Sequence, residues 1–489
     1  MTEPEKKKKK LSNTADSISS SIGSSSSSLN YTSAETKKFN KLNRMVEEEG
    51  VEDLVDYEEE DERRSNESDD DEMCVVANDV IHFRIVRNEG ELDLNQQIDV
   101  NDIENTKRFL DFQPTFTHQL FGENEKIEGY ENIRINIFFT NSLYCWLNIQ
   151  YDSKSDDATD VKGILTAKDV EFPFSDYRAP PLYFPYTENL TEFKSKLSQP
   201  NTPKGEQIDV YYREGRCFEI YKASMSQIGA AHKPWQFLSL FFIDGTSYIN
   251  DQDENWEFFL SYEKVKNTET NNFEYIPIGF SSIYPFFVMK KEGNQLVDTR
   301  RLRVSQFLIL PPFQGHGHGR KLLLAIYTYA TKGFKEQKAA VGYNALSFDE
   351  KTFPPRECYE VTVENPGDDF QAMRTKVDLE VCAPLFKAAK RKADETDRET
   401  FEDFKKRAKP ITKLSDGQLR LCFEILWLKS LNENVNTTNE ERNEFKLFIK
   451  KRLYREYDME GAFEDDEERK EKLEELYQEQ VNEYKVFLK

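Results

Sequence analysis

The stretch QFLILPPFQGHGHGRKLLLAIYTYA, residues 306–330, decides the fold of this chain. A short apolar run ends at two prolines, and a glycine-rich turn then leads into an amphipathic segment. Proline has no N–H to donate to a ladder, so a strand ending at Leu310 must stop pairing at Pro311. The stretch therefore predicts a strand, a tight turn and a helix, in that order.

The turn QGHGHG, residues 314–319, admits three interpretations. A metal site has little support, because His316 and His318 are two residues apart and no acid or cysteine lies nearby at ligand spacing. The pattern GxxxxGK[ST] is absent, and a dinucleotide fingerprint would need a third spaced glycine and a distal acid. A glycine-rich turn before a helix remains, which aims backbone N–H groups at a pyrophosphate. Glycine suits this role because a side chain would keep the ligand away from the backbone.

The proline pair adds a second indication. A strand that diverges from its neighbour leaves backbone groups free for an extended ligand that bears amides. Pantetheine is such a ligand, and it ends in a pyrophosphate. The strand and the turn together therefore indicate a site for acetyl-coenzyme A.

Strand-like and helix-like patterns alternate around this unit. Before it we expect strands over 75–87 and 133–139, a helix or buried segment over 235–244, and neighbouring strands over 256–265 and 275–291. Within and after it we expect a strand over 301–310, a helix over 318–332, a strand over 359–365 and a helix over 368–381. This alternation predicts two parallel strands. Charged, amphipathic helices are expected over 411–431, 442–457 and 467–489.

These patterns divide the chain into four parts. We expect a Lys/Ser-rich and acidic tail (1–74), an N-terminal α+β domain (75–232), a second domain (233–382) and a C-terminal helical region (383–489). In the tail, the block Lys6 to Lys10 is either a nuclear import signal or a solvated run. The acidic run over 47–72 either receives a basic protein or only solubilises the chain.

Charge and composition exclude several classes of protein. The formal net charge is −23, which disfavours bare nucleic acid as a partner and favours basic partners. The sequence shows neither a long apolar run nor a secretory signal, so no membrane role is expected. The six cysteines are scattered without a CxxC motif, which predicts reduced thiols and no metal.

Three motifs of this sequence resemble those of a known protein family. Gln314, Gly317 and Gly319 fill the marked positions of the Q/R-x-x-G-x-G/A motif of the GNAT acetyltransferase superfamily. RVSQFLILPPFQGHGHG (303–319), TVENP (362–366) and FTHQLFG (116–122) together resemble the catalytic subunits of type B histone acetyltransferases, over about residues 75–431.

The resemblance implies a fold and a cofactor site. It implies an α+β fold with a GNAT-type mixed sheet and helices on both faces. Residues 75–232 would then bind substrate, and residues 233–382 would bind acetyl-CoA and catalyse transfer. The implied acetyl-CoA contacts are Phe307, Leu308 and Ile309 for the pantetheine arm, and Gln314, Gly315, His316, Gly317, His318, Gly319 and Arg320 for the pyrophosphate.

Acetyl transfer to lysine needs a base, because an ammonium with a pKa of about 10.4 is protonated at neutral pH and cannot attack. A carboxylate can remove that proton directly or through one water. Glu364 stands where a strand ends, and the resemblance makes it the general base rather than a surface cap. Asn365 replaces the acid that usually follows in the family. Asp244, in FFIDGTS, matches a second acid near the catalytic centre.

The resemblance also places substrate contacts. Glu123, Asn124 and Glu125 match a segment that contacts the histone tail, although acidic loop residues are often only solvated. Tyr284, Pro285 and Phe286 match an aromatic stretch beside the peptide groove, although such aromatics are often core. Lys376 stands at a further tail-contacting position but differs in type from the usual residue, and Arg374 is the matching basic residue nearby.

These features imply an enzyme that transfers acetyl from acetyl-CoA to lysines of free, newly made histones, chiefly the histone H4 tail. Transfer would be direct, because Cys358, the cysteine nearest the motifs, has no base partner. The resemblance also implies a WD-repeat histone-binding subunit and a place in the cytoplasm and nucleus. The alternatives are acetylation of another amine, such as a protein N-terminus, or a histone-binding escort.

Overall fold

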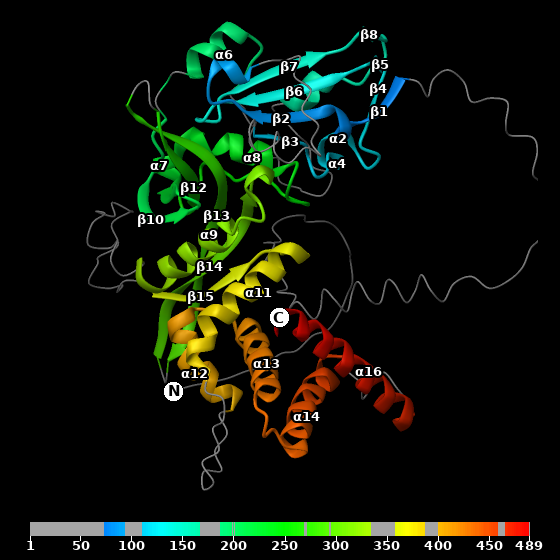
Figure 1. Ribbon diagram of the computed structural model, residues 1–489, viewed down its shortest axis with the longest axis vertical. Helices are drawn as coiled ribbons and strands as arrows, with labels where there is room; N and C mark the ends of the chain where they lie inside the picture. Colours follow the sequence, from blue (N-terminus) through cyan, green and yellow to red (C-terminus); the bar gives the residue numbers. More distant parts are fainter. Residues whose placement is uncertain are drawn as a thin grey trace, which may run out of the picture.

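The structure, a computed structural model, describes residues 73–92, 110–166, 186–197, 199, 201–267, 271–292, 295–333, 357–386, 400–457 and 465–488. Figure 1 shows three parts along the long axis, with a small sheet at one end, a larger sheet in the middle and helices at the other end. The lysine block and the acidic run lie outside the described residues. The expectations for them stay predictions.

The N-terminal part is built on a five-stranded sheet with the order β3-β2-β6-β7-β9. Its elements are β1 (Cys74–Val76), α2 (Ala77–Val80), β2 (Ile81–Ile85), η2 (Glu89–Glu91), β3 (Asp111–Phe112), α4 (His118–Phe121), β4 (Lys126–Glu128), β5 (Tyr130–Glu131), β6 (Arg134–Phe139), β7 (Cys145–Gln150), β8 (Ser153–Lys154), α5 (Val161–Thr166), β9 (Tyr186–Thr187) and α6 (Leu190–Leu197). The strand expected over 133–139 is confirmed as β6. The strand expected over 75–87 is interrupted by α2, because β1 pairs with β4 whereas β2 joins a different sheet through β6.

The central part is a six-stranded sheet with the order β10-β11-β12-β13-β14-β15. Its strands are β10 (Glu206–Arg213), β11 (Arg216–Ser224), β12 (Glu257–Lys266), β13 (Phe273–Glu292), β14 (Gln295–Ile309) and β15 (Glu357–Val363). Neighbouring strands are antiparallel except β14 and β15, which confirms the expected parallel pair. β10 and β11 precede residue 232, so this sheet begins within the segment assigned to the N-terminal domain. The domain boundaries themselves stay predictions.

Helices cover both faces of the central sheet. They are α7 (Met225–Ile228), η3 (Gly229–His232), α8 (Lys233–Ser239), α9 (His318–Thr328), η5 (Tyr329–Gly333), α11 (Asp368–Cys382) and η7 (Ala383–Leu385). Trp235 of α8 packs on Phe280 of β13, at 5.1 Å between ring centroids. Phe370 of α11 packs on Phe307 of β14 at 4.9 Å. Phe307 pairs with Ser281, the neighbour of Phe280, so the two contacts lie on opposite faces. The predicted α+β fold, with a mixed sheet and helices on both faces, is confirmed.

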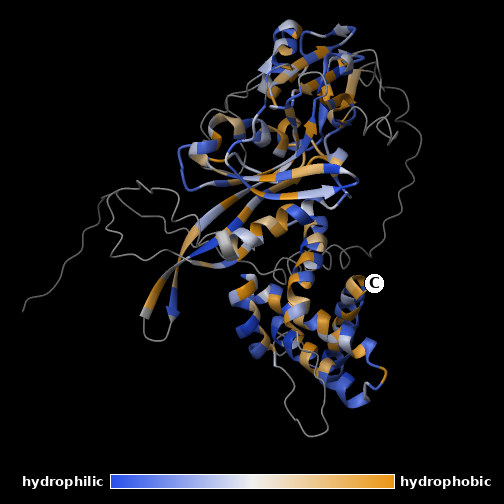
Figure 2. Cartoon of the chain, turned by 60° about the vertical axis from the view of Figure 1, so that its left-hand side comes forward, coloured by the Kyte–Doolittle hydropathy of each residue, from blue (hydrophilic) through white to orange (hydrophobic). Residues whose placement is uncertain are grey.

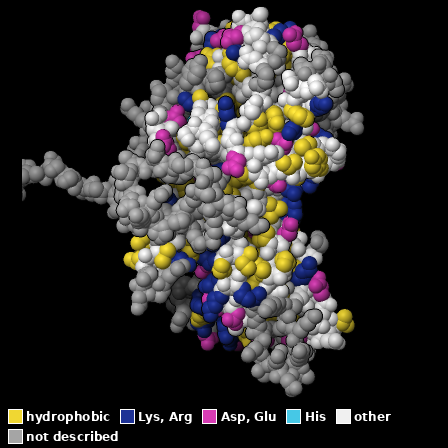
Figure 3. Space-filling model, turned by 90° about the vertical axis from the view of Figure 1, so that its left-hand side faces the viewer, with side chains coloured by type: hydrophobic (Ala, Val, Ile, Leu, Met, Phe, Trp, Pro, Cys, Tyr) yellow, Lys and Arg dark blue, Asp and Glu magenta, His cyan; other side chains and the backbone are white. Residues whose placement is uncertain are grey.

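The hairpin of β13 and β14 extends beyond the rest of the sheet (Figure 2). It exposes large apolar side chains, with Phe287 52% and Leu296 67% exposed. Figure 3 shows hydrophobic side chains in several separate groups on this side of the molecule, with Lys and Arg side chains between them.

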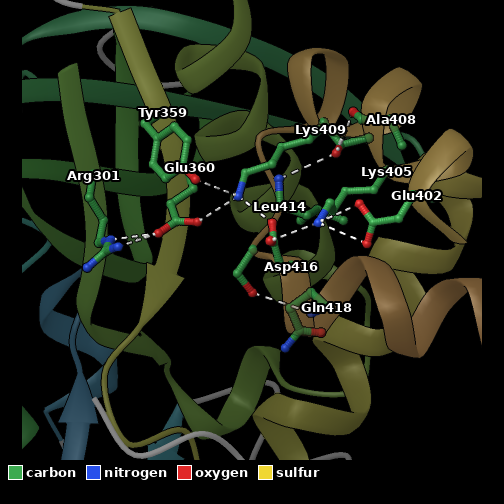
Figure 4. A network of polar contacts seen from close by, with 12 residues as sticks. Arg301, Tyr359, Glu360, Glu402, Lys405, Ala408, Lys409, Leu414, Asp416 and Gln418 are labelled. Carbon is green, nitrogen blue, oxygen red and sulfur yellow. Dashed lines mark hydrogen bonds and ion pairs between the residues drawn. The ribbon is translucent and has the colours of Figure 1, made fainter. Parts of the chain in front are cut away.

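The C-terminal part consists of helices that are tied to β15. They are α12 (Phe401–Thr412), α13 (Asp416–Glu433), α14 (Asn439–Glu456), α16 (Asp466–Lys485) and η8 (Val486–Leu488). The Val361 N–H donates to the Lys413 carbonyl at 2.7 Å, and Leu414 forms a bridge with Val361. Lys409 of α12 reaches Glu360 of β15 at 3.2 Å (Figure 4). The helices expected over 442–457 and 467–489 are confirmed as α14 and α16. The helix expected over 411–431 begins only at Asp416, because residues 413 and 414 bond to the strand instead.

Two further expectations concern the cysteines and membrane-spanning helices. All six cysteines are free. None of the helices within the described ranges is long and apolar enough to cross a membrane.

Candidate active site

The site begins where β14 and β15 diverge. Their parallel pairing ends at Val304 and Val363, and the Glu364 N–H still donates to the Val304 carbonyl at 2.9 Å. β14 continues to Ile309, and along this stretch its described partner is β13 alone. The Leu310 N–H bonds the Ile278 carbonyl of β13 at 2.8 Å. Successive residues of a strand direct their backbone N–H and C=O groups to opposite sides. The backbone groups of Phe307 and Ile309 therefore face away from β13, on the side where the pairing with β15 has ended. This side of β14 is called the open side below.

Two of the three residues predicted to bind the pantetheine arm direct their backbone groups to the open side of β14. Gln314 Nε2 donates to the Ile309 carbonyl at 2.8 Å, which confirms that this carbonyl faces away from β13. By the same alternation, the backbone of Leu308 faces β13. The groups able to bond an extended ligand are therefore those of Phe307 and Ile309, while Leu308 contributes a buried side chain.

The turn after the strand needs each of its glycines for a different reason. η4 (Pro311–Phe313) leads into it. Gly315 has a φ of 74°, and no atom of the described residues beyond its chain neighbours lies within 4 Å of the point where a Cβ would stand, so open space lies above its backbone. Gly317 has a φ of 75° and ends the turn as the N-cap of α9. A Cβ on Gly319 would lie 2.8 Å from the Met373 Sδ, so the Met373 side chain of α11 would have to shift.

The turn 314–319 and the start of α9 contain several backbone N–H groups that are available to a ligand. Within the described residues, the N–H groups of residues 315–320 make no hydrogen bond of normal geometry, whereas the Lys321 N–H bonds the Gly317 carbonyl at 3.2 Å. The first turn of α9 has no acid, so its helix dipole is not compensated. A cavity of about 110 Å³ beside the turn is lined by Arg213, Arg216 and both histidines, among others. The backbone donors and the uncompensated helix dipole fit a pyrophosphate.

Three predicted cofactor residues have their side chains engaged within the protein. His318 is buried and its Nδ1 lies 2.7 Å from the Tyr211 hydroxyl. His316 Nδ1 lies 2.7 Å from the Gln314 carbonyl. Arg320 Nε donates to Glu380 at 2.9 Å. At these positions the backbone, rather than the side chain, is available to a ligand.

The buried ring of His318 should make stability depend on pH. Burial, with Arg213 as the next cause, lowers the pKa of His318 from 6.5 to about 4. Between these values a proton binds the unfolded chain but not the folded one, so stability falls as pH falls. From pH 7.5 to pH 5 the free energy of unfolding should drop by about 2 kcal/mol through this residue. Urea unfolding of His318→Gln should show a pH dependence smaller by that amount.

His316→Gln is the matched control, because its ring lies on the same turn but is only partly buried. The loss of pH dependence should be smaller in this variant than in His318→Gln, because only His318 carries the buried ring. An equal loss in both variants would contradict the assignment to His318.

Glu364 lies at the point of divergence. The Ser305 hydroxyl donates to its Oε2 at 2.7 Å, and Arg303 Nη1 lies 3.6 Å from its Oε1. The side chain remains 43% exposed, so a substrate can reach it. Cys358, by contrast, is buried, and burial raises the pKa of its thiol to about 12. The carboxylate, and not this thiol, is available for chemistry.

A second group of acidic residues lies where the segment FTHQLFG (116–122) contacts the segment FFIDGTS (241–247). His118 Nε2 lies 3.1 Å from the Asp244 carboxylate, which is 78% exposed. Gln119 Nε2 donates to the Leu240 carbonyl at 2.9 Å. Glu125 is used internally, because its carboxylate accepts from the Thr117 and His118 N–H groups at the start of α4. Its neighbours Glu123 and Asn124 are exposed.

The aromatic stretch borders the same site. Phe286 is 37% exposed, and Arg303 lies over its ring at 4.5 Å. Arg303 therefore contacts both Phe286 and Glu364. The Tyr284 hydroxyl donates to Asp253 at 2.8 Å, and Pro285 follows it on β13.

The basic residues of α11 differ in exposure. Lys376 is exposed, whereas Arg374 is buried and lies 3.6 Å from Asp378. A buried, paired guanidinium cannot reach a substrate tail, so Arg374 stabilises the packing of α11.

Sequence reasoning missed several residues of the site. Ser305, Arg303 and His118 contact the predicted acids, yet nothing in their spacing singles them out. Among the described residues no cluster of His, Cys, Asp and Glu could hold a metal ion.

Comparison with known proteins adds a family context. A family model described as "Histone acetyl transferase HAT1 N-terminus" matches residues 73–244. A "Histone acetyltransferase type B catalytic subunit" of Cryptococcus neoformans is 28% identical, over 84% of this chain and 96% of the relative. The human protein of the same description is 29% identical, over 73% of this chain and 77% of the relative. A crystal structure of an aminoglycoside acetyltransferase from a soil metagenome covers 37% of this chain and 93% of its own, at 15% identity and a TM-score of 0.18, too low to support a conclusion.

Proposed function

Because the chain belongs to the type B histone acetyltransferase catalytic subunits, we propose that it acetylates lysines of free, newly synthesised histones, chiefly in the histone H4 tail. Its general class, a histone acetyltransferase, follows from the relatives. The observation that supports the specific reaction is the placement of Glu364 beside the open edge of β14.

The proposed reaction is direct transfer. Acetyl-CoA supplies the acetyl thioester, and the backbone of Phe307 and Ile309 with the turn 314–320 would hold it. Glu364 takes a proton from the lysine ammonium, directly or through one water, and the amine then attacks the thioester carbonyl. The C–N bond forms and the C–S bond breaks, the nitrogen loses its extra proton, and the coenzyme A sulfur takes up a proton, so that coenzyme A leaves as the free thiol. Asp244 adds negative charge near the incoming lysine.

Acidic and aromatic groups around the site support a basic peptide as substrate. Glu123 and Asp244 are exposed acids, and Phe286 offers an apolar surface beside Glu364. Such a surface attracts a lysine-rich tail through charge and seats its aliphatic stems on the ring. Asn124, Tyr284, Pro285 and Lys376 complete the proposed substrate surface.

Mass spectrometry of an H4 tail peptide incubated with the full chain and acetyl-CoA tests this proposal. We expect acetyl groups on internal lysines, and an equal rate with a peptide whose N-terminus is blocked. Labelling confined to the free N-terminal amine would show acetylation of another amine. Tight histone binding without any labelling would show an escort protein.

A partner and a location belong to the same proposal. We propose a WD-repeat histone-binding subunit as partner, and activity in the cytoplasm and nucleus on histones not yet assembled with DNA. The net charge of −23 supports a basic protein over bare nucleic acid as the partner of this chain.

A further inference from the structure

A single buried amide links the parts of the active site. Gln306 of β14 is 3% exposed, and its Nε2 donates to the Thr246 hydroxyl at 3.1 Å and to the Ser247 carbonyl at 3.0 Å. It also exchanges hydrogen bonds with the Gln236 amide of α8, at 2.7 and 3.0 Å. Gln306 thereby joins β14 to α8 and to the segment that follows Asp244.

The backbone of Gln306 is held by two serine hydroxyls of β13. Its N–H donates to the Ser282 hydroxyl at 3.1 Å, and its carbonyl accepts from the Ser281 hydroxyl at 2.9 Å. In the register of β13 and β14, Gln306 pairs with Ser282 and Val304 pairs with Ile283. Ser305 therefore stands in a bulge, with no partner residue on β13. A bulge re-aims the side chain at its apex.

The bulge has a direct consequence for Glu364. Ser305 is the residue whose hydroxyl donates to the Glu364 carboxylate, at 2.7 Å. The Arg303 guanidinium also lies against this carboxylate, from one residue before Val304 on the same strand. The residue after Gln306, Phe307, offers its backbone to the open side. The position of the bulge therefore sets both the proposed base and the start of the proposed pantetheine strand.

We infer that Gln306 is a positioning residue for acetyl transfer, which fixes the β14 bulge so that Ser305 holds the Glu364 carboxylate. The inference rests on the proposed role of Glu364 as general base. Gln306 touches neither substrate nor cofactor, and it acts through Ser305. The same amide ties the Asp244 turn to β14, so both proposed acids depend on one side chain.

Gln306→Met keeps the length of the side chain and removes its hydrogen bonds. We expect kcat to fall roughly tenfold, as for the loss of one hydrogen bond to a charged group. KM for the histone tail should change less than about threefold, because the side chain of Gln306 is buried and its loss acts on the rate alone. Acetyl-CoA affinity, measured by calorimetry, should change less than about threefold.

Ser305→Ala should reproduce these changes, and the double variant should be no slower than either single one. Thr246→Val, which removes one bond to Gln306 and keeps the shape of the side chain, should lower kcat in the same direction by less. It serves as the test if Gln306→Met does not fold.

Two outcomes overturn the inference. An unchanged kcat in Thr246→Val and Gln306→Met, or rate losses that multiply in the double variant, would show a structural role alone. Glu364→Gln distinguishes this failure from that of the proposed function. A fully active Glu364→Gln would remove the base and the positioning role together, whereas an inactive one beside unaltered Gln306 variants would refute the positioning role alone.

Discussion

Glu364→Gln should lower kcat for acetylation of a histone tail by about 10²–10⁴ at neutral pH, the range typical of general-base catalysis. The amide has nearly the same shape, so Ser305 and the backbone bond to Val304 keep the strand end in place. What is lost is the acceptor for the lysine proton. At neutral pH only roughly one lysine in a few thousand is already neutral, so the uncatalysed path is slow.

The pH dependence of this variant gives a second, independent measurement. As pH rises toward the pKa of free lysine, about 10.4, more substrate is neutral without help from the enzyme. The difference between the variant and the parent chain should therefore shrink as pH increases. A constant difference at all pH values would indicate damage to the site rather than the loss of a base.

Asp369→Asn provides the matched control. Asp369 is an exposed acid in the first turn of α11, five residues after Glu364, and its loss changes the net charge by the same amount. We expect its kcat to stay within about twofold of the parent value. Calorimetry should give the same acetyl-CoA affinity for both variants, because neither residue belongs to the turn 314–320. A loss of rate as large in Asp369→Asn would show that charge, and not position, is responsible.

The sequence predicted the centre of this molecule better than its edges. The proline pair, the three glycines and the run of strands around them have strong local signals, and β12–β15, α9 and α11 all appear where expected. The parallel pair of β14 and β15 follows from the strand-helix-strand order. By contrast, the turn α2 depends on a change of sheet between β1 and β2, which no local pattern reports.

Some residues of the site could be predicted from local sequence motifs, and others could not. Glu364 and the turn could be found because their motifs are contiguous in sequence. Ser305, Gln306 and His118 depend on contacts between distant segments, as in the pair of His118 and Asp244, which are 126 positions apart. Glu125 stays a predicted substrate contact, and the bonds of its carboxylate to the start of α4 become visible only in three dimensions.

Gly315→Val should weaken acetyl-CoA binding by about 10-fold to 100-fold, or about 1.4–2.8 kcal/mol. At a φ of 74° a β-branched residue is strained, and its side chain would stand in the open space above the turn. That space is where a pyrophosphate must approach the unpaired N–H groups of residues 315–320. Isothermal titration calorimetry with acetyl-CoA measures the effect directly, without dependence on the histone substrate.

Gly229→Val separates the strain from the lost contact. Gly229 also has a positive φ, 50°, and open space around it, but it lies between α7 and η3, away from the turn. Both variants should lose stability on unfolding, because a bulky residue is forced into an unfavourable backbone region. Only Gly315→Val should lose affinity for acetyl-CoA. Equal affinities in the two variants would place the pyrophosphate elsewhere and leave the glycines of the turn with a role in packing alone.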